Sequence, residues 1–277
     1  MTTAYFDRNV FDQIDRGRDI TPADLEMIRA EVSAGTLSIL LSFETVAETV
    51  MARQDTALRG LGLVKELARQ ALPIKPHTDL LRDDIRAFAE GRESVPPFIF
   101  AKFYGDRMID DVRTSPPGLR SDVANEKRYK GKLNDNLKAY LSDERRALGG
   151  KRPASFEKYW AQRSAYYAEA FAHSAGYLKQ CRERGIEGLL KVRSVRMVVG
   201  AFLSLLYSLL FEGRGVHGGT SYDMKHAPTM SAADIIVSDD GELRRLLGRV
   251  PIPGLQVMSL PDFVGLIRSG WLIGWPR

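Results

Sequence analysis

The chain has 277 residues, of which 44% are hydrophobic and 27% charged, a composition typical of a soluble globular protein with one large or two modest domains. Its 40 Lys and Arg outnumber its 35 Asp and Glu, and the net charge of +5 permits a polyanionic partner without requiring one. The single cysteine, Cys181, excludes an intrachain disulfide and any multi-cysteine zinc site, and it is in keeping with a reducing cytoplasm.

Two strands and three helices are predicted in the first 70 residues. The apolar run Ala4–Phe6 predicts a strand that ends at Asp7, and Leu37–Leu41 predicts a second strand. The helices are predicted over Val10–Ile14, from Pro22 to the break at Gly35, and from Phe43 to about Arg69. Thr21 and Ser42 are the expected N-caps of the second and third helices.

The middle of the chain favours helices. They are predicted over Thr78–Glu90, Asn125–Leu148, Ser155–Arg184 and Ile186–Phe211, and the one strand candidate there is Pro97–Phe100. The most apolar stretch, Met197–Phe211, is shorter than the roughly 20 residues that a membrane span needs. We therefore predict a helix buried in the protein and no membrane partner.

The first ten residues have no basic region followed by a long apolar run, so we expect no signal peptide and a cytoplasmic location.

Acidic residues gather around one predicted strand near the end of the chain. Asp223 opens a short helix that runs to Met230, and the β-branched run Ile235–Val237 predicts a buried strand. Asp234 precedes this strand, and Ser238, Asp239 and Asp240 follow it, at the end where open α/β sheets bind ligands. We expect these acids to converge on one spot, where Mg²⁺ or Mn²⁺ would offset their mutual repulsion. The alternative is that they only cap helices, with Asp239 or Asp240 starting Gly241–Leu247.

A last strand at Leu255–Ser259 and a helix from Leu260 through Ile267 complete the pattern. Strands that alternate with helices and carry acids at their ends predict a parallel sheet with helical crossovers. We therefore predict a three-layer α/β/α fold. Its core is built from residues 1–70 and 212–277, and a mostly helical insertion, residues 71–211, interrupts it.

Several stretches of the sequence resemble the PIN-domain nucleases. Tyr5-Phe-Asp7-Arg-Asn9-Val-Phe resembles the first strand of that family, which is followed by Asp-x-Asn-Val. Ser42-Phe-Glu-Thr-Val-Ala-Glu48 resembles its Ser-x-x-Thr-φ-Ala-Glu site, where φ is apolar. Asp223-Met-Lys-His-Ala and Ala233-Asp-Ile-Ile-Val-Ser-Asp-Asp240 resemble its closing pair of acids, although Ser238 stands where Thr is usual. These stretches cover under half of the chain.

The resemblance implies a PIN-like domain in which Asp7, Glu48, Asp223 and Asp240 are the catalytic, metal-binding carboxylates. Asn9 would steady Asp7 by a hydrogen bond, and Asp234 or Asp239 would be a further ligand or would hold a metal-bound water. The usual activity of the family is Mg²⁺- or Mn²⁺-dependent cleavage of RNA, often as a toxin that is paired with an antitoxin.

The sequence leaves alternatives for two of these positions. Glu44 and Glu48 lie one helical turn apart on the same face, so Glu44 is the rival metal ligand. His226 lies close to the expected site, but we interpret it as a satisfied structural histidine rather than a catalytic one.

A basic cluster in the predicted insertion is the candidate nucleic-acid surface. It comprises Lys127, Arg128, Lys130 and Lys132 around Tyr129, followed by Arg145, Arg146, Lys151 and Arg152. Clustered cations contact phosphates without reading sequence, and an aromatic ring can stack on a base. The alternative is an ordinary solvated face, since acidic residues are interleaved with the cations.

We therefore expect a metal-dependent endoribonuclease, as a toxin, in a defence system or in RNA processing. A bound divalent ion would activate water for phosphodiester hydrolysis, and no covalent nucleophile is required. One alternative is a PIN-like scaffold that has lost catalysis, and another is a structure-specific DNA nuclease. The expected partners are RNA and, for a toxin, an antitoxin protein or a second copy of the chain.

Overall fold

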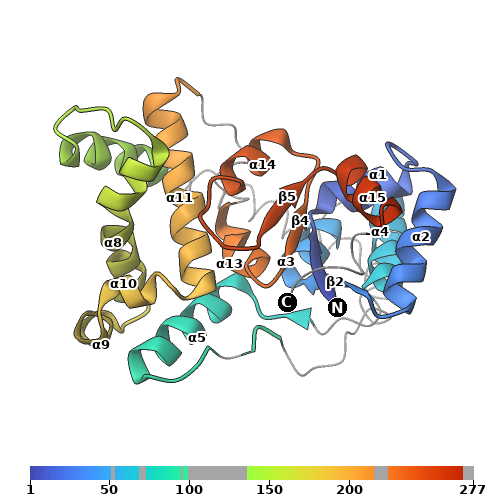
Figure 1. Cartoon of the computed structure of the whole chain (residues 1–277), viewed down its shortest axis with the longest axis horizontal. Helices are drawn as coiled ribbons and strands as arrows, with labels where there is room; N and C mark the ends of the chain where they lie inside the picture. Colours follow the sequence, from blue (N-terminus) through green and yellow to red (C-terminus); the bar gives the residue numbers. More distant parts are fainter. Residues whose placement is uncertain (51–53, 69–72, 95, 99–135, 215–223, 271–277) are drawn as a thin grey trace.

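In the part of the chain that the structure describes, five parallel strands form a single sheet in the order β3-β2-β1-β4-β5 (Figure 1). The computed structural model describes residues 1–50, 54–68, 73–94, 96–98, 136–214 and 224–270. The strands are β1 (Thr2–Phe6), β2 (Leu37–Ser42), β3 (Pro73–Ile74), β4 (Ile235–Val237) and β5 (Gln256–Met258). In β1, Ala4 pairs with Ile39 of β2 on one side and with Ile235 of β4 on the other. The two ends of the chain therefore meet in the centre of the sheet.

Four of the five strands were predicted from their apolar runs, and β3 was not. It is only two residues long and begins with Pro73, which lacks the N–H that a central strand needs, and it lies at the sheet edge. The strand candidate Pro97–Phe100 contributes one antiparallel bridge between Phe98 and Ile74, and its last two residues lie outside the described residues.

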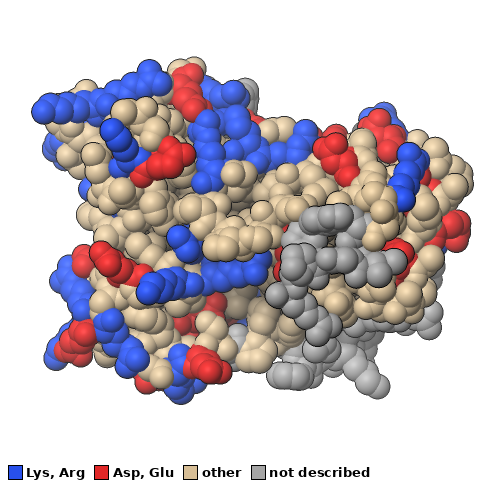
Figure 2. Space-filling view, viewed as in Figure 1, with Lys and Arg blue, Asp and Glu red and all other residues tan. Residues whose placement is uncertain are grey.

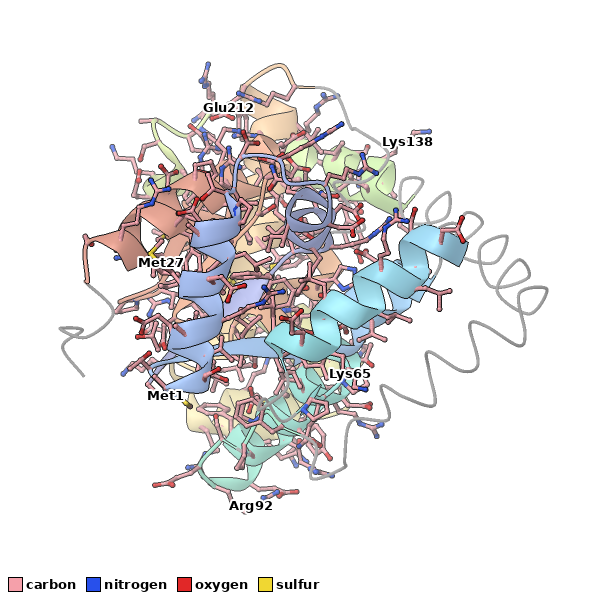
Figure 3. All side chains as sticks on the ribbon, turned by 90° about the vertical axis from the view of Figure 1, so that its right-hand side faces the viewer. Met1, Met27, Lys65, Arg92, Lys138 and Glu212 are labelled. Atoms are coloured by element: carbon pink, nitrogen blue, oxygen red, sulfur yellow. The ribbon has the colours of Figure 1, made fainter. Side chains whose placement is uncertain are left out.

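Helices cover both faces of the sheet, because the central strands are apolar on both sides. Phe6 and Val237 point into one core, and Tyr5 and Ile236 into the other. The first core is covered by α1 (Arg8–Asp15), α2 (Pro22–Ser33), α4 (Gln54–Leu67) and α15 (Leu260–Arg268). Figure 3 looks onto this side, with Met27 on α2 and Lys65 on α4. The arrangement is consistent with a three-layer α/β/α fold.

The second core is covered by α5 (His77–Glu90), α11 (Arg193–Phe211), α13 (Ala227–Met230) and α14 (Gly241–Leu247). Outside them lie a helix over residues 136–147, α8 (Phe156–Ser174), α9 (Leu178–Arg184) and α10 (Ile186–Leu189). The two long helices predicted over Ser155–Arg184 and Ile186–Phe211 are each divided. Gly176, with a positive φ of 85°, separates α8 from α9, and residues 190–192 separate α10 from α11.

The apolar helix α11 is the centre of this second layer. Among the described residues it is the one helix long and apolar enough to cross a membrane, yet 72% of its apolar window is buried inside the protein. It packs against α5, α8, α13 and α14. The prediction of a buried core helix at Met197–Phe211 is confirmed.

The segment predicted as an insertion, residues 71–211, contributes to the sheet and to its cover. It supplies β3, and its helices α5 and α11 share one core with Tyr5, Leu40 and Ile236 of the strands. The boundaries of the insertion remain a prediction, but its helices complete a layer of the fold.

Helix starts follow the predicted caps. Thr21 and Asp24 form a capping box at the start of α2. The Ser42 hydroxyl accepts a hydrogen bond of 2.9 Å from the Thr45 N–H and so caps α3 (Phe43–Val50), the helix that follows β2. The predicted long helix at 43–69 is described as α3 and α4, and residues 51–53 lie outside the described residues.

Candidate functional site

The candidate site lies at the carboxyl edge of the sheet, where β1 and β4 are neighbours. From β1 the chain moves to β2 on one side, and from β4 it moves to β5 on the other, so the order of strands reverses between β1 and β4. Ligands of open α/β sheets bind outside the carboxyl ends of the strands at such a point. Asp7 follows β1 there, and Ser238, Asp239 and Asp240 follow β4.

Asp7 is anchored to both strands. Its N–H donates to the Val237 carbonyl over 3.0 Å, and its Oδ1 accepts from the Arg8 N–H at 2.8 Å. Burial raises the pKa of Asp7 above its usual value, hydrogen bonds from Ser238 and Arg8 oppose the rise, and the negative charge of Asp240 adds to it. A half-buried carboxylate beside a second acid is a group whose charge a bound cation would stabilise.

Asp240 is the N-cap of α14. Its Oδ1 accepts hydrogen bonds from the N–H groups of Glu242 and Leu243, at 2.7 and 3.1 Å. Within the described part of the chain, no hydrogen bond to its Oδ2 is found. Asp240 thus caps α14, as the alternative interpretation of the sequence predicted, and only one of its carboxylate oxygens takes part in the cap.

Ser238 joins the two acids. Its hydroxyl donates to Asp7 Oδ2 over 2.9 Å and accepts from the Asp240 N–H over 3.1 Å, and its side chain is fully buried. Asn9, as expected, also reaches Asp7 Oδ2, at 3.4 Å. The structure therefore brings together Asp7, Asn9, Ser238 and Asp240.

Asp234 and Asp239, the other two acids around β4, do not join this group. Asp234 sits at the opposite, amino edge of the sheet, where its Oδ2 accepts from the N–H and the hydroxyl of Thr3 at 2.9 and 2.7 Å. At about 3.3 Å of rise per residue it lies roughly 13 Å from Ser238, so the expected convergence with Asp240 does not occur. Asp239 is at the right edge but exposed. Asp223 and the cluster at Lys127, Arg128, Lys130 and Lys132 lie outside the described residues.

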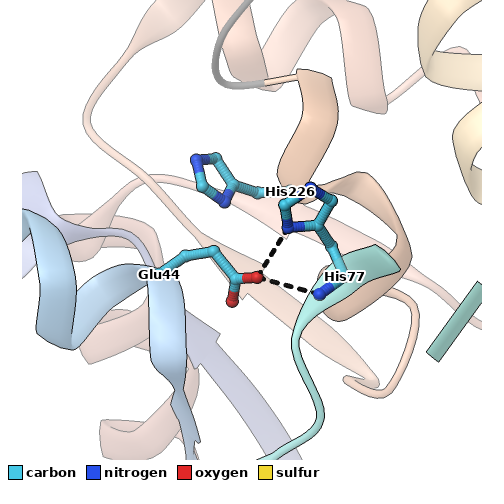
Figure 4. Close-up of side chains that lie close together, drawn as sticks. All are labelled: Glu44, His77 and His226. Carbon is cyan, nitrogen blue, oxygen red and sulfur yellow. Dashed lines mark hydrogen bonds and ion pairs between the residues drawn. The ribbon is translucent and has the colours of Figure 1, made fainter. Parts of the chain in front are cut away.

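A second polar group lies beyond β2, where Glu44 of α3 faces His77 and His226 (Figure 4). Glu44 Oε1 lies 2.9 Å from His77 Nδ1 and accepts from the His77 N–H at 3.0 Å. One ligand atom from each of the three residues lies within 4.8 Å of the other two, so the group can hold a metal ion. Burial acts to raise the pKa of Glu44, but the hydrogen bonds from His77 and the nearby His226 outweigh it and hold the pKa below its usual value.

Glu48, the acid that the resemblance favours, lies beside this group. Its Oε1 is 3.6 Å from Nε2 of His226, which belongs to a 3₁₀ turn, η1 (Met224–His226). Both candidate glutamates thus face His226 from the same side of α3.

Tyr5 lies between the two polar groups. Its hydroxyl is 3.5 Å from the Ser42 hydroxyl and 3.4 Å from that of Thr45. Burial raises the pKa of Tyr5, and the charges of Glu44 and Asp7 raise it further, so the hydroxyl stays protonated. The influence of both acids on one hydroxyl indicates that the two groups flank Tyr5.

His77 is the functional candidate that the sequence did not reveal. It lies 33 residues from Glu44, and no motif links the two. The sequence offered one hint of its position: Pro76 precedes α5, so His77 is the first residue of that helix. His226 was noticed near the site but interpreted as a structural histidine.

Part of the predicted basic surface is described. Arg145, Arg146, Lys151 and Arg152 are exposed, and Figure 2 shows Lys and Arg at the upper left, where this segment lies. Three of the four line a hollow of about 390 Å³ together with Leu148, Leu210 and Phe211. Phosphate contacts are chemically possible there.

No family model matches the chain, and no curated protein or solved structure matches it either. The likeness to PIN-domain nucleases therefore rests on the sequence motifs alone.

Proposed function

We propose that the chain is a divalent-metal-dependent nuclease of PIN-like fold that hydrolyses RNA phosphodiesters. The observation that carries the proposal is the hydroxyl of Ser238, which joins Asp7 and Asp240 at the strand-order reversal of the sheet. Two acids held at that edge supply the hard oxygen ligands that suit Mg²⁺ or Mn²⁺.

The donor atoms fit such an ion. Asp7 would offer its half-buried carboxylate, and Asp240 would offer Oδ2, the oxygen that does not cap α14. When bound, a divalent ion lowers the pKa of a water molecule and offsets charge on the phosphoryl group. The chain's own residues orient the ligands: Ser238 fixes Asp7, and Asn9 adds a longer hydrogen bond to the same oxygen.

RNA is favoured as the substrate by the sequence resemblance, and the exposed cations at Arg145, Lys151 and Arg152 support a polyanionic ligand. A further metal ligand would come from the glutamates of α3, the helix that follows the neighbouring strand β2. The resemblance to the PIN motif favours Glu48 for this role.

The test is cleavage of end-labelled single-stranded RNA and DNA by the purified chain in Mg²⁺ or Mn²⁺. We expect RNA cleavage that a chelator stops, and a fall of about 100-fold or more in Asp7→Asn, since it removes a ligand charge. Glu183→Gln is the control, because Glu183 is an exposed acid on α9, in the outer helical layer. It should cleave like the wild type.

Three other outcomes separate the alternatives. Cleavage of DNA alone would replace RNA by DNA as the substrate class. Cation binding that Asp7→Asn removes, without cleavage of either nucleic acid, would indicate a scaffold that has lost catalysis. Cleavage that survives Asp7→Asn unchanged would overturn the proposed site.

A further inference from the structure

The group formed by Glu44, His77 and His226 differs chemically from the carboxylate pair at Asp7 and Asp240. It combines two imidazoles with a carboxylate, and its members come from three separate elements, α3, α5 and η1 (Figure 4). Chain segments more than 30 residues apart in sequence thus place three ligand-type side chains around one point.

The spacing of the donor atoms suits a single ion. Ligand atoms about 2.1 Å from one ion lie roughly 3.0 Å apart when they subtend a right angle and roughly 3.4 Å apart in a tetrahedron. Glu44 Oε1 and His77 Nδ1 are 2.9 Å apart, and the three donors lie within 4.8 Å of one another. The three donors therefore lie close to the spacing that one ion requires.

The group is buried, and a further acid lies beside it. The side chains of Glu44 and His226 are 6% and 5% exposed, and that of His77 is 24% exposed. Glu48 Oε1 lies 3.6 Å from His226 Nε2, so a further carboxylate borders the group. Two imidazoles with one or two carboxylates are a donor set that metals of the zinc type prefer and that Mg²⁺ does not.

A simpler role for Glu44 also exists. Its Oε1 accepts from the His77 N–H, the first residue of α5, and its Oε2 lies 3.4 Å from the Thr229 hydroxyl. A carboxylate that only caps α5 explains these two contacts. It does not explain why a second imidazole, His226, faces the same carboxylate, or why Glu48 faces His226 in turn.

We propose that Glu44, His77 and His226 form a site for a transition-metal ion of the zinc class, separate from the carboxylate pair at Asp7 and Asp240. His77 links the site to the surface, because it also lines an open, mainly apolar hollow of about 360 Å³ between α5, α8, α11 and α13. The inference stands independently of the proposed nuclease function.

Calorimetric titration of untagged, chelator-treated protein with Zn²⁺ tests the site. We expect one ion per chain and far weaker binding of Mg²⁺ at this site. His77→Ala and His226→Ala should each weaken Zn²⁺ binding by about 100-fold or more, because each removes an imidazole ligand. Co²⁺ in place of Zn²⁺ should give the visible absorption of a low-symmetry nitrogen and oxygen site, and both variants should lose it.

His173→Ala is the matched control, since His173 is exposed on α8 and should not affect Zn²⁺ affinity or the Co²⁺ spectrum. Thermal unfolding in chelator reports whether each variant folds, and Glu44→Gln, which keeps the side-chain shape, serves as a further ligand variant. Unchanged Zn²⁺ affinity in folded His77→Ala and His226→Ala, or no Zn²⁺ binding by the wild type, would overturn the site. Asp7→Asn should retain Zn²⁺ binding, so a failure of this inference is distinguishable from a failure of the nuclease proposal.

Discussion

Ser238 holds two acidic residues in place with one hydroxyl group. The hydroxyl donates to Asp7 and accepts from the Asp240 N–H, and it is fully buried. Groups that orient metal ligands in this way commonly change metal affinity or activity by 10- to 100-fold when they are removed, roughly as much as some ligands do. Under the proposed function, Ser238 is therefore a positioning residue.

We expect Ser238→Ala to lower metal-dependent cleavage by about 10-fold or more, because Asp7 loses the hydrogen bond that fixes its carboxylate. The free energy of unfolding should fall by about 1–3 kcal/mol, since the Asp240 N–H also loses its partner. Ser238→Thr keeps the hydroxyl and should recover most of the activity. Cleavage assays over a range of Mn²⁺ concentrations check this, because a positioning role shifts the metal dependence. Equal losses in the Ala and Thr variants would contradict it.

At the residue scale, the sequence predicted the carboxylate pair but not the histidine group. Asp7 and Asp240 were predictable because each directly follows a recognisable strand, and parallel strands align their carboxyl ends. Asp234 was misplaced because it precedes its strand and so lies at the other edge. His77 meets Glu44 only because β3, which precedes α5, pairs with β2, which precedes α3, and no local pattern encodes that pairing.

At the element scale, one buried carboxylate fastens the helix of residues 136–147 to α8. Glu144 is 1% exposed and accepts hydrogen bonds from Arg163 at 2.7 and 2.9 Å, from Tyr159 at 2.8 Å and from Tyr167 at 2.7 Å. Burial acts to raise the pKa of Glu144, but these hydrogen bonds outweigh it and hold the pKa below its usual value. The network is satisfied only while Glu144 is ionised.

We expect Glu144→Gln to lower the free energy of unfolding at neutral pH by about 3 kcal/mol, because Arg163 loses its charged partner. The folded pKa of Glu144 is lowered, so its stabilising contribution is complete above the unfolded value near 4.5 and disappears as the pH falls through the folded value. Urea unfolding at several pH values should thus show the difference between wild type and variant shrinking in acid. Asp143→Asn, a change in an exposed ion pair, should have almost no effect. A difference that stays constant down to acid pH would contradict the account.

Strands were easier to predict than the helical boundaries. β1, β2, β4 and β5 are apolar runs bounded by polar residues, whereas β3 is a short edge strand that begins with Pro73. The predicted helix Ser155–Arg184 ends early because Gly176 adopts a positive φ. The break changes the packing partners, because α8 packs against α11 and α9 packs against α5.

At the scale of the whole molecule, the two cores are joined through the sheet. Ala4 and Phe6 of β1 belong to one core, and Tyr5 between them belongs to the other. The helices of residues 136–211 cover the second core and share it with Tyr5, Leu40 and Ile236. Loss of these helices would expose the sheet face that they cover. We therefore expect the helical segment and the strands to unfold together rather than as two independent units.

Leu203→Ala tests this cooperativity. Leu203 is fully buried on α11, and its truncation should lower the free energy of unfolding by about 2–5 kcal/mol. Native-state hydrogen exchange should then show amides of β1 and β4 losing as much protection as amides of α8, because one core joins them. Lys179→Ala, at an exposed position, is the control and should leave all rates unchanged. If protection falls in α8 and α11 while β1 keeps its wild-type rates, the helical segment is an autonomous subdomain. The shared core would then contribute little to the stability of the sheet.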